Sequence, residues 1–114
     1  MKKILIVAAH PDDEILGCGG TMSKHVSKGD MVNVIFLTNG VSSRDQSKIT
    51  MKKNIIKRKK AAIKASKIIG TKEPYFLNFS DNQLDKHSLL KIIKSIETLI
   101  LKIKPDTIYT HFNN

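Results

Sequence analysis

The sequence contains little of several residue types: one cysteine, no tryptophan and two arginines among 114 residues. The single cysteine, Cys18, excludes an internal disulfide and agrees with a reducing, cytoplasmic compartment. It also excludes a cysteine-cluster metal site, so a bound metal ion would need histidine and carboxylate ligands. No apolar run reaches the ~18 residues that a membrane-spanning helix needs, and we therefore expect no membrane span.

Lysine supplies most of the positive charge. The chain has 18 lysines and two arginines but only ten acidic residues, which gives a net charge of +10. A nucleic-acid-binding surface is one interpretation, since clustered cations release counterions from phosphate. Five lysines instead follow helical spacing, which is typical of the solvated face of an amphipathic helix. They are Lys53, Lys57, Lys60, Lys64 and Lys67. With six aromatic residues in the chain, no stacking surface interleaves with the charge, so we expect no nucleic-acid partner.

Strand-like and helical segments alternate along the whole chain. The expected strands are residues 3–9, 32–38, 74–79 and 107–111. The expected helices are residues 14–28, 48–69 and 89–103, the last ended by Pro105. This alternation predicts one α/β domain over residues 1–114, a Rossmann-like three-layer α/β/α fold with a four-stranded parallel sheet and three helices. A short sheet with an exposed edge strand would favour a homo-oligomer.

Polar groups gather directly after the expected strands. These groups are His10–Glu14, Thr38–Gly40, Ser80–Asn82 and His111. In open parallel sheets the ligand lies outside the carboxyl ends of the strands, so we expect these groups to share one edge. His25, in the first expected helix, lies away from this edge, and we expect it to be exposed.

The segment "HPDDE" places His10 and Asp13 three residues apart across a strand-to-helix turn, with Pro11 fixing one dihedral angle between them. Such a turn can aim both side chains at one point, and an imidazole nitrogen and a carboxylate oxygen suit zinc. Asp12 lies between them and could accept a proton from water, the role of the base in metal-assisted hydrolysis. A capped helix start is the alternative, but capping explains one aspartate and not a histidine and a proline beside two.

The three glycines of "GCGGT" do not form a dinucleotide-binding fingerprint. Gly17, Gly19 and Gly20 lack the G-x-G-x-x-G spacing and fall inside the expected helix, so we expect no nucleotide site there. Because glycine weakens a helix, three of them predict close backbone packing against a neighbouring element or a substrate.

The opening stretch "ILIVAAHPDDEILGCGGT" resembles that of the PIG-L and LmbE-like family of zinc-dependent de-N-acetylases. Weaker similarities follow at "FLTNG", "RKKAAIKASKIIG", "FSDNQLD" and "KPDTIYTHF". The resemblance implies a hydrolase that removes the acetyl group from an N-acetylglucosamine-type sugar or sugar conjugate. Water would be activated at Zn²⁺, or at another divalent metal, and the partner would be a small acetylated amino sugar.

The same resemblance assigns roles to single residues. It makes His10 and Asp13 zinc ligands and Asp12 the general base. Arg58 and Asp81 fall where family members contact the sugar, and His111 would line the site.

The chain departs from the family pattern at two points. Ala61 stands where the family has a glutamate, so the second helix is expected to contact substrate differently. The family's third zinc ligand is a histidine in a motif after the fourth strand, and the sequence reaches Asn114 before that motif. We therefore expect residues 1–114 to be the amino-terminal part of a longer deacetylase domain, and the activity of these residues alone is in question.

Two other classes of protein stay open at this point. A response-regulator receiver domain also opens with a lysine-rich start and an acidic pair that holds Mg²⁺; Asp81 would then be phosphorylated and Thr110 would be the switch hydroxyl. Against it, His10 and Pro11 separate the acids from the strand, and no fifth strand with a following lysine is present. A basic nucleic-acid-binding module is the second alternative.

Overall fold

The computed structural model describes residues 1–9, 13–38, 47–79 and 86–110. Within these residues four parallel strands form one sheet, in the order β3-β2-β1-β4. The strands are β1 (Lys3–Ala8), β2 (Met31–Thr38), β3 (Tyr75–Phe79) and β4 (Thr107–Thr110). The helices are α1 (Asp13–Ser27), α2 (Lys48–Ile69) and α3 (Lys86–Ile103). The α/β class and the number of elements expected from the sequence are confirmed.

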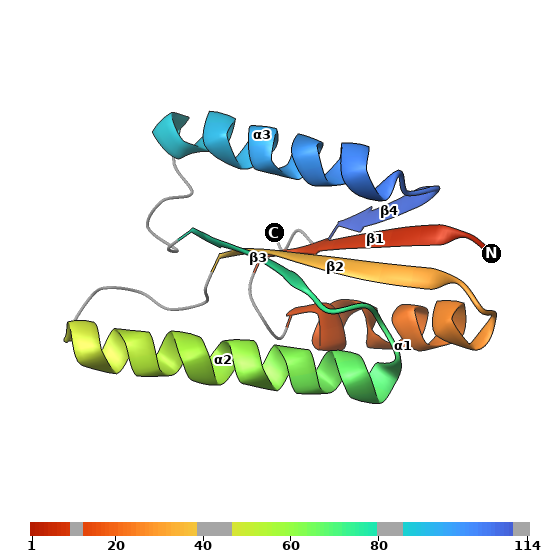
Figure 1. Cartoon of the computed structure of the whole chain (residues 1–114), viewed down its shortest axis with the longest axis horizontal. Coiled ribbons are helices and arrows are strands. Elements are labelled where there is room, and N and C mark those ends of the chain that lie inside the picture. Colours follow the sequence, from red (N-terminus) through yellow and green to blue (C-terminus); the bar gives the residue numbers. More distant parts are fainter. Residues whose placement is uncertain (10–12, 39–46, 80–85, 111–114) are drawn as a thin grey trace.

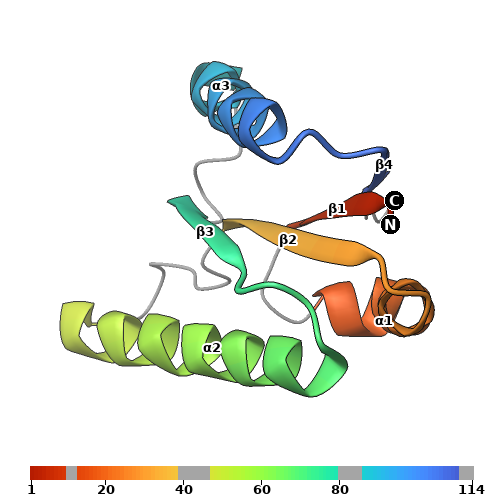
Figure 2. The same cartoon turned by 45° about the vertical axis from the view of Figure 1, so that its right-hand side comes forward.

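The helices cover the two faces of the sheet unequally. Helices α1 and α2 lie on one face and α3 lies on the other, which makes the three layers (Figures 1 and 2). Helix α3 carries the chain from β3, at one edge, across to β4 at the opposite edge. The order therefore reverses between β1 and β4. A receiver domain has the order 2-1-3-4-5, so the receiver alternative is wrong.

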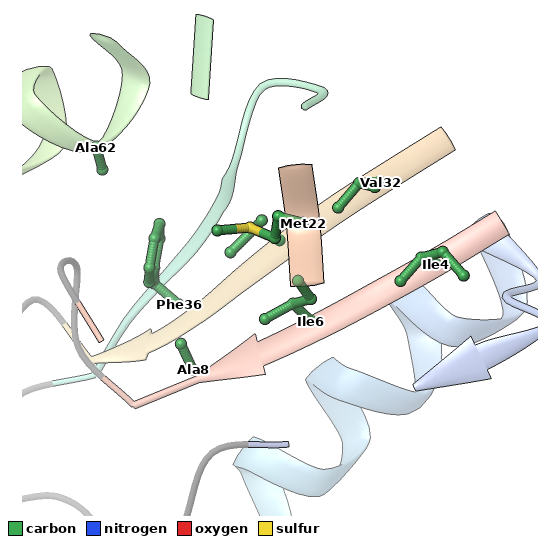
Figure 3. Packing of buried hydrophobic residues seen from close by; sticks show 8 residues of the cluster. Ile4, Ile6, Ala8, Met22, Val32, Phe36 and Ala62 are labelled. Atoms are coloured by element: carbon green, nitrogen blue, oxygen red, sulfur yellow. The ribbon is translucent and has the colours of Figure 1, made fainter. Parts of the chain in front are cut away.

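The core consists of two apolar clusters, one on each face of the sheet. The cluster toward α1 and α2 contains Ile4, Ile6, Ala8, Met22, Val32, Val34, Phe36 and Ala62 (Figure 3). The cluster toward α3 contains Leu5, Val7, Ile35 and Ile103. Successive strand residues alternate between the two clusters because strand side chains point to opposite faces. Burial on both faces explains why β1 and β2 consist mostly of apolar residues.

Helix α2 has both of its predicted ends. The Ser47 hydroxyl accepts a hydrogen bond from the Thr50 amide at 3.1 Å, and Gly70 ends the helix with a φ of 98°. The five lysines with helical spacing are all exposed, as expected for a solvated face. Among the helices of the described residues, none has the length and apolar character needed to cross a membrane.

Several predicted boundaries differ from those of the structure by one residue, and the start of α3 differs by three. Helix α3 begins at Lys86 and not at residue 89, because its first turn is polar and carries none of the apolar repeat used to find it. Strand β4 is described as far as Thr110, and its predicted last residue, His111, lies outside the described residues. Apolar repeats locate the buried face of an element better than its ends.

Gly20 does not show the close packing expected of the α1 glycines. It is exposed, and a Cβ built there would have no neighbour within 4 Å. Because alanine is the better helix former, we expect Gly20→Ala to raise the free energy of unfolding by about 1 kcal/mol in urea denaturation.

Gly70→Ala is the matched control for this substitution. Gly70 has a positive φ, and its Cβ would come within 2.9 Å of Val26 Cγ1. We expect this variant to lose stability. A destabilised Gly20→Ala variant would show that α1 has close neighbours at that position.

Candidate functional site

The carboxyl ends of the four strands lie at one edge of the sheet because all pairings are parallel. We call this the carboxyl edge, defined by the last strand residues Ala8, Thr38, Phe79 and Thr110. Val7 pairs with Thr110, so β1 and β4 end side by side at the point where the strand order reverses. In α/β sheets ligands bind at this reversal point. The segments that follow β1 and β4 are those that carry His10 and His111.

The structure describes only part of the predicted site. His10, Asp12, Asp81 and His111 lie outside the described residues. Strand β1 ends at Ala8 and α1 begins at Asp13, so the chain passes from a strand to a helix within the stretch that contains the "HPDDE" segment. The start of a helix favours a carboxylate, since its amide groups carry partial positive charge.

Thr38 fixes the backbone directly before the motif. Its amide donates to the Ala9 carbonyl oxygen at 2.8 Å, and its hydroxyl donates to the same oxygen at 2.9 Å. The Thr38 side chain is buried, and the hydrogen bond of its hydroxyl group is partly buried. The two hydrogen bonds hold Ala9, the residue before His10, against the end of β2. Sequence reasoning grouped Thr38 with the polar groups at this edge and missed this role; a hydroxyl ending an apolar strand was the available signal.

Arg58 lies on the half-buried side of α2. It is one turn before Ala62, which is buried in the cluster that contains Ala8 and Phe36 near the carboxyl ends of β1 and β2 (Figure 3). Because α2 begins after the end of β2 and runs back along the sheet, Arg58 lies about 5–6 Å closer to the carboxyl edge than Ala62. This position agrees with a role near the edge.

A hollow of about 350 Å³ surrounds Arg58 on α2. The described residues that line it are Asn54, Lys57, Arg58 and Ala61, which follow one another at helical spacing. Two of these side chains are cationic, one is an amide, and Ala61 brings no carboxylate where the family pattern has a glutamate. The hollow therefore presents hydrogen-bond donors to a polar or anionic group.

His25 is not exposed, contrary to the expectation from the sequence. Its Nδ1 lies 2.8 Å from Asp30 Oδ2, and its Nε2 lies 3.0 Å from the Tyr109 hydroxyl. In the neutral ring Nδ1–H donates to Asp30, and Nε2 accepts from Tyr109. Asp30 also accepts from the Lys2 amide. The network lies on the side where β2 begins, and it ties β4 to α1.

The hydrogen bond from His25, followed by that from the Lys2 amide, holds the pKa of Asp30 below its usual value. Ionised Asp30 therefore contributes stability at pH values above its usual pKa. This contribution is lost as the pH falls through the lowered pKa of the folded state.

The chemistry of the motif residues fits a metal ion such as zinc, since it combines an imidazole with carboxylates. In the part of the chain that the structure describes, no group of three or more His, Cys, Asp or Glu side chains could hold a metal ion. A metal site would therefore depend on the residues at the carboxyl edge that lie outside that part.

Comparison with known proteins agrees with the resemblance seen in the sequence. The chain is 30% identical over 105 residues to the diacetylchitobiose deacetylase of Thermococcus kodakarensis, over 92% of this chain and 39% of that protein. It is 29% identical over 114 residues to a probable N-acetyl-alpha-D-glucosaminyl L-malate deacetylase 2 of Bacillus cereus, over 97% of this chain and 52% of that protein.

A solved structure shows the same fold. The N,N'-diacetylchitobiose deacetylase of Pyrococcus horikoshii superposes with a TM-score of 0.82 and 28% identity, over 94% of this chain and 39% of that chain. The chain thus spans between about two fifths and one half of these proteins. The family model for PIG-L, described as GlcNAc-PI de-N-acetylase, matches residues 5–114. Because this match covers nearly the whole chain, the protein is a member of the PIG-L family.

Proposed function

We propose that this chain supplies the metal-binding and proton-accepting residues of an N-deacetylase. The substrate would be an N-acetylglucosamine-type sugar or sugar conjugate, and the products would be acetate and a free amino sugar. The observation that carries the proposal is the strand order, which puts the end of β1 at the reversal point of the sheet in a member of the PIG-L family. The "HPDDE" segment follows β1 in the sequence. Related deacetylases named for diacetylchitobiose and N-acetylglucosaminyl malate support the substrate class.

Each residue of the proposed site has one role. His10 and Asp13 would hold Zn²⁺ or another divalent metal through an imidazole nitrogen and a carboxylate oxygen. When bound, the metal polarises the acetamide carbonyl and makes water more acidic. Asp12 takes the proton of the attacking water, and the same carboxyl group can return a proton to the departing amine.

The remaining residues would bind the sugar. The guanidinium of Arg58 donates hydrogen bonds from the hollow on α2, while Asp81 accepts from sugar hydroxyl groups. His111, following β4, would line the site beside His10. We place this chemistry in the cytoplasm, in agreement with the single cysteine.

Further residues are needed to complete the site. The chain spans 39% to 52% of its relatives, and two protein ligands are one fewer than the three that catalytic zinc usually has. We propose that a carboxyl-terminal part of the domain supplies the third ligand. Residues 1–114 alone would then bind zinc weakly and release little acetate.

Zinc binding by the purified chain tests the metal site directly. We expect His10→Ala to weaken zinc affinity by at least about 10-fold, measured by competition with a chromophoric chelator. His87→Ala, which removes a histidine outside the motif, is the matched control and should leave the affinity unchanged. Equal affinity in the parent chain and in His10→Ala would contradict the assignment.

Acetate release tests the reaction. The 114 residues would be fused to the part of the Thermococcus kodakarensis protein that the match does not cover, with diacetylchitobiose as substrate. Zinc-dependent acetate release by the fusion, and little by the 114 residues alone, is the expected result. Strong activity of the 114 residues alone would show that they contain every ligand.

A further inference from the structure

Asn33 is a polar residue in the middle of an apolar sheet. Its side chain is 6% exposed, and it lies on the face of β2 that carries Ile35 toward α3. Among the described residues its amide group has no hydrogen-bond partner. An unpaired buried amide costs about 1–3 kcal/mol, so a group of this kind needs a physical explanation.

The Asn33 side chain lines a cavity of about 220 Å³ below the last turn of α3. The other lining residues are Lys3, Met31, Tyr75, Lys102 and Ile103. Strand pairing explains this grouping, because Lys3 pairs with Met31 and Ile35 pairs with Tyr75 on the same face. Helix α3 ends over the side of the sheet where the strands begin (Figure 1), so the cavity lies away from the carboxyl edge.

The described wall of the cavity carries positive charge. Of the six described residues that line it, two are lysines and none is acidic. Neither lysine has an ion-pair partner within the described part of the chain. The Asp106 carboxylate accepts from the Lys3 backbone amide at 2.7 Å and forms no ion pair with the Lys3 ammonium group. The Lys102 ammonium lies 5.5 Å from the centre of the Tyr75 ring, which turns it toward the cavity wall.

We infer that this cavity binds a small organic anion. The Lys3 and Lys102 ammonium groups would hold its carboxylate or phosphate oxygens, and the Asn33 amide would donate a hydrogen bond to one of them. The Met31 and Tyr75 side chains would pack against its apolar part. A bound anion would give the Asn33 amide a hydrogen-bond partner and so offset the cost of burying it. Chloride or water alone would leave the Met31 and Tyr75 side chains uncovered.

This ligand site is separate from the proposed deacetylase site and does not depend on it. The two sites lie at opposite ends of the strands, one where β1 begins and one where β1 ends. Failure of zinc binding or of acetate release would leave the anion site standing, and the reverse also holds.

NMR titration of the 114-residue chain tests the proposal. Benzoate and inorganic phosphate serve as probes, and sodium chloride at equal ionic strength is the reference. We expect saturable shifts of the Asn33 side-chain amide signals with one or both probes. Shifts with phosphate only would mean that the cavity prefers a phosphate group, and shifts with benzoate only would mean that it prefers a carboxylate. No saturable shift above the chloride reference would overturn the inference.

Three variants separate a built site from general attraction to a basic protein. Asn33→Leu and Lys102→Gln should each weaken the binding by about 10-fold or more, since each removes one hydrogen bond to a charged group. Lys91→Gln, an exposed lysine on the same helix outside the cavity, should leave the affinity unchanged. Equal weakening by Lys91→Gln and Lys102→Gln would overturn the site. Lys102 is exposed, so this comparison holds even if Asn33→Leu does not fold.

Discussion

Replacing Asp12 by asparagine is expected to slow acetate release by about 100- to 10,000-fold, the usual contribution of a general base. Asparagine keeps the size of aspartate but cannot accept the proton of the attacking water at neutral pH. If Asp12 lies beside the metal and does not bind it, zinc affinity stays close to that of the parent chain. The rate is measured as acetate release by the fusion protein, and the affinity by chelator competition.

Asp13→Asn is the matched comparison for this prediction. It removes the same charge one residue later in the chain, at the first residue of α1. As a proposed metal ligand, Asp13 should affect zinc affinity together with the rate. If Asp12→Asn loses zinc as strongly as Asp13→Asn does, Asp12 is a ligand and the assignment of the base is wrong.

Phe36→Ala is expected to lower the free energy of unfolding by about 3–5 kcal/mol. Phe36 is fully buried and stacks on Phe76 at 5.4 Å between ring centroids. It also belongs to the cluster that joins Ala8 and Ala62 near the carboxyl edge (Figure 3). Truncation to alanine removes the aromatic ring from this cluster, so the loss combines the transfer free energy of the buried apolar surface with the cost of a cavity.

Urea denaturation followed by circular dichroism measures this loss. Leu101→Ala is the control, because Leu101 is 74% exposed on α3 and should change stability by less than about 0.5 kcal/mol. Since a domain of this size has about 5–15 kcal/mol of stability, the Phe36 variant would retain only part of it. A loss no larger than that of Leu101→Ala would mean that α2 does not depend on this cluster.

The elements of the fold were predictable because they depend on local signals. Helix α2 has both ends where the sequence predicts them, since Ser47 caps its start and Gly70 takes the left-handed conformation at its end. The strand order was not predictable in the same way. Alternating strands and helices are compatible with more than one order. In this fold β3 pairs with β2 and β4 pairs with β1, whereas in a receiver β3 lies beside β1.

The candidate site also has features that local sequence patterns identify and features that depend on contacts between distant residues. The "HPDDE" motif is contiguous in sequence and was identified from residue type and spacing. Its assignment as a metal site stays a prediction, because His10 and Asp12 lie outside the described residues. The structural roles of His25 and Asn33 were not visible. His25 contacts Tyr109, 84 residues later, and Asn33 shares a cavity with residues of β1, β3 and α3. Contacts of this range depend on the strand order, which local patterns leave open.

The central position of β1 has a consequence for synthesis of the chain. Of the four described strands, β1 is made before the others, but it lies between β2 and β4. The hydrogen bond of its Lys3 amide to Asp106 spans 103 residues of the sequence. At typical rates of translation one edge of β1 would wait roughly 5–20 s for its partner to leave the ribosome. During that interval the unpaired edge of β1 can pair with strands of other chains. The yield of folded protein in cells should therefore depend on chaperones that shield such edges.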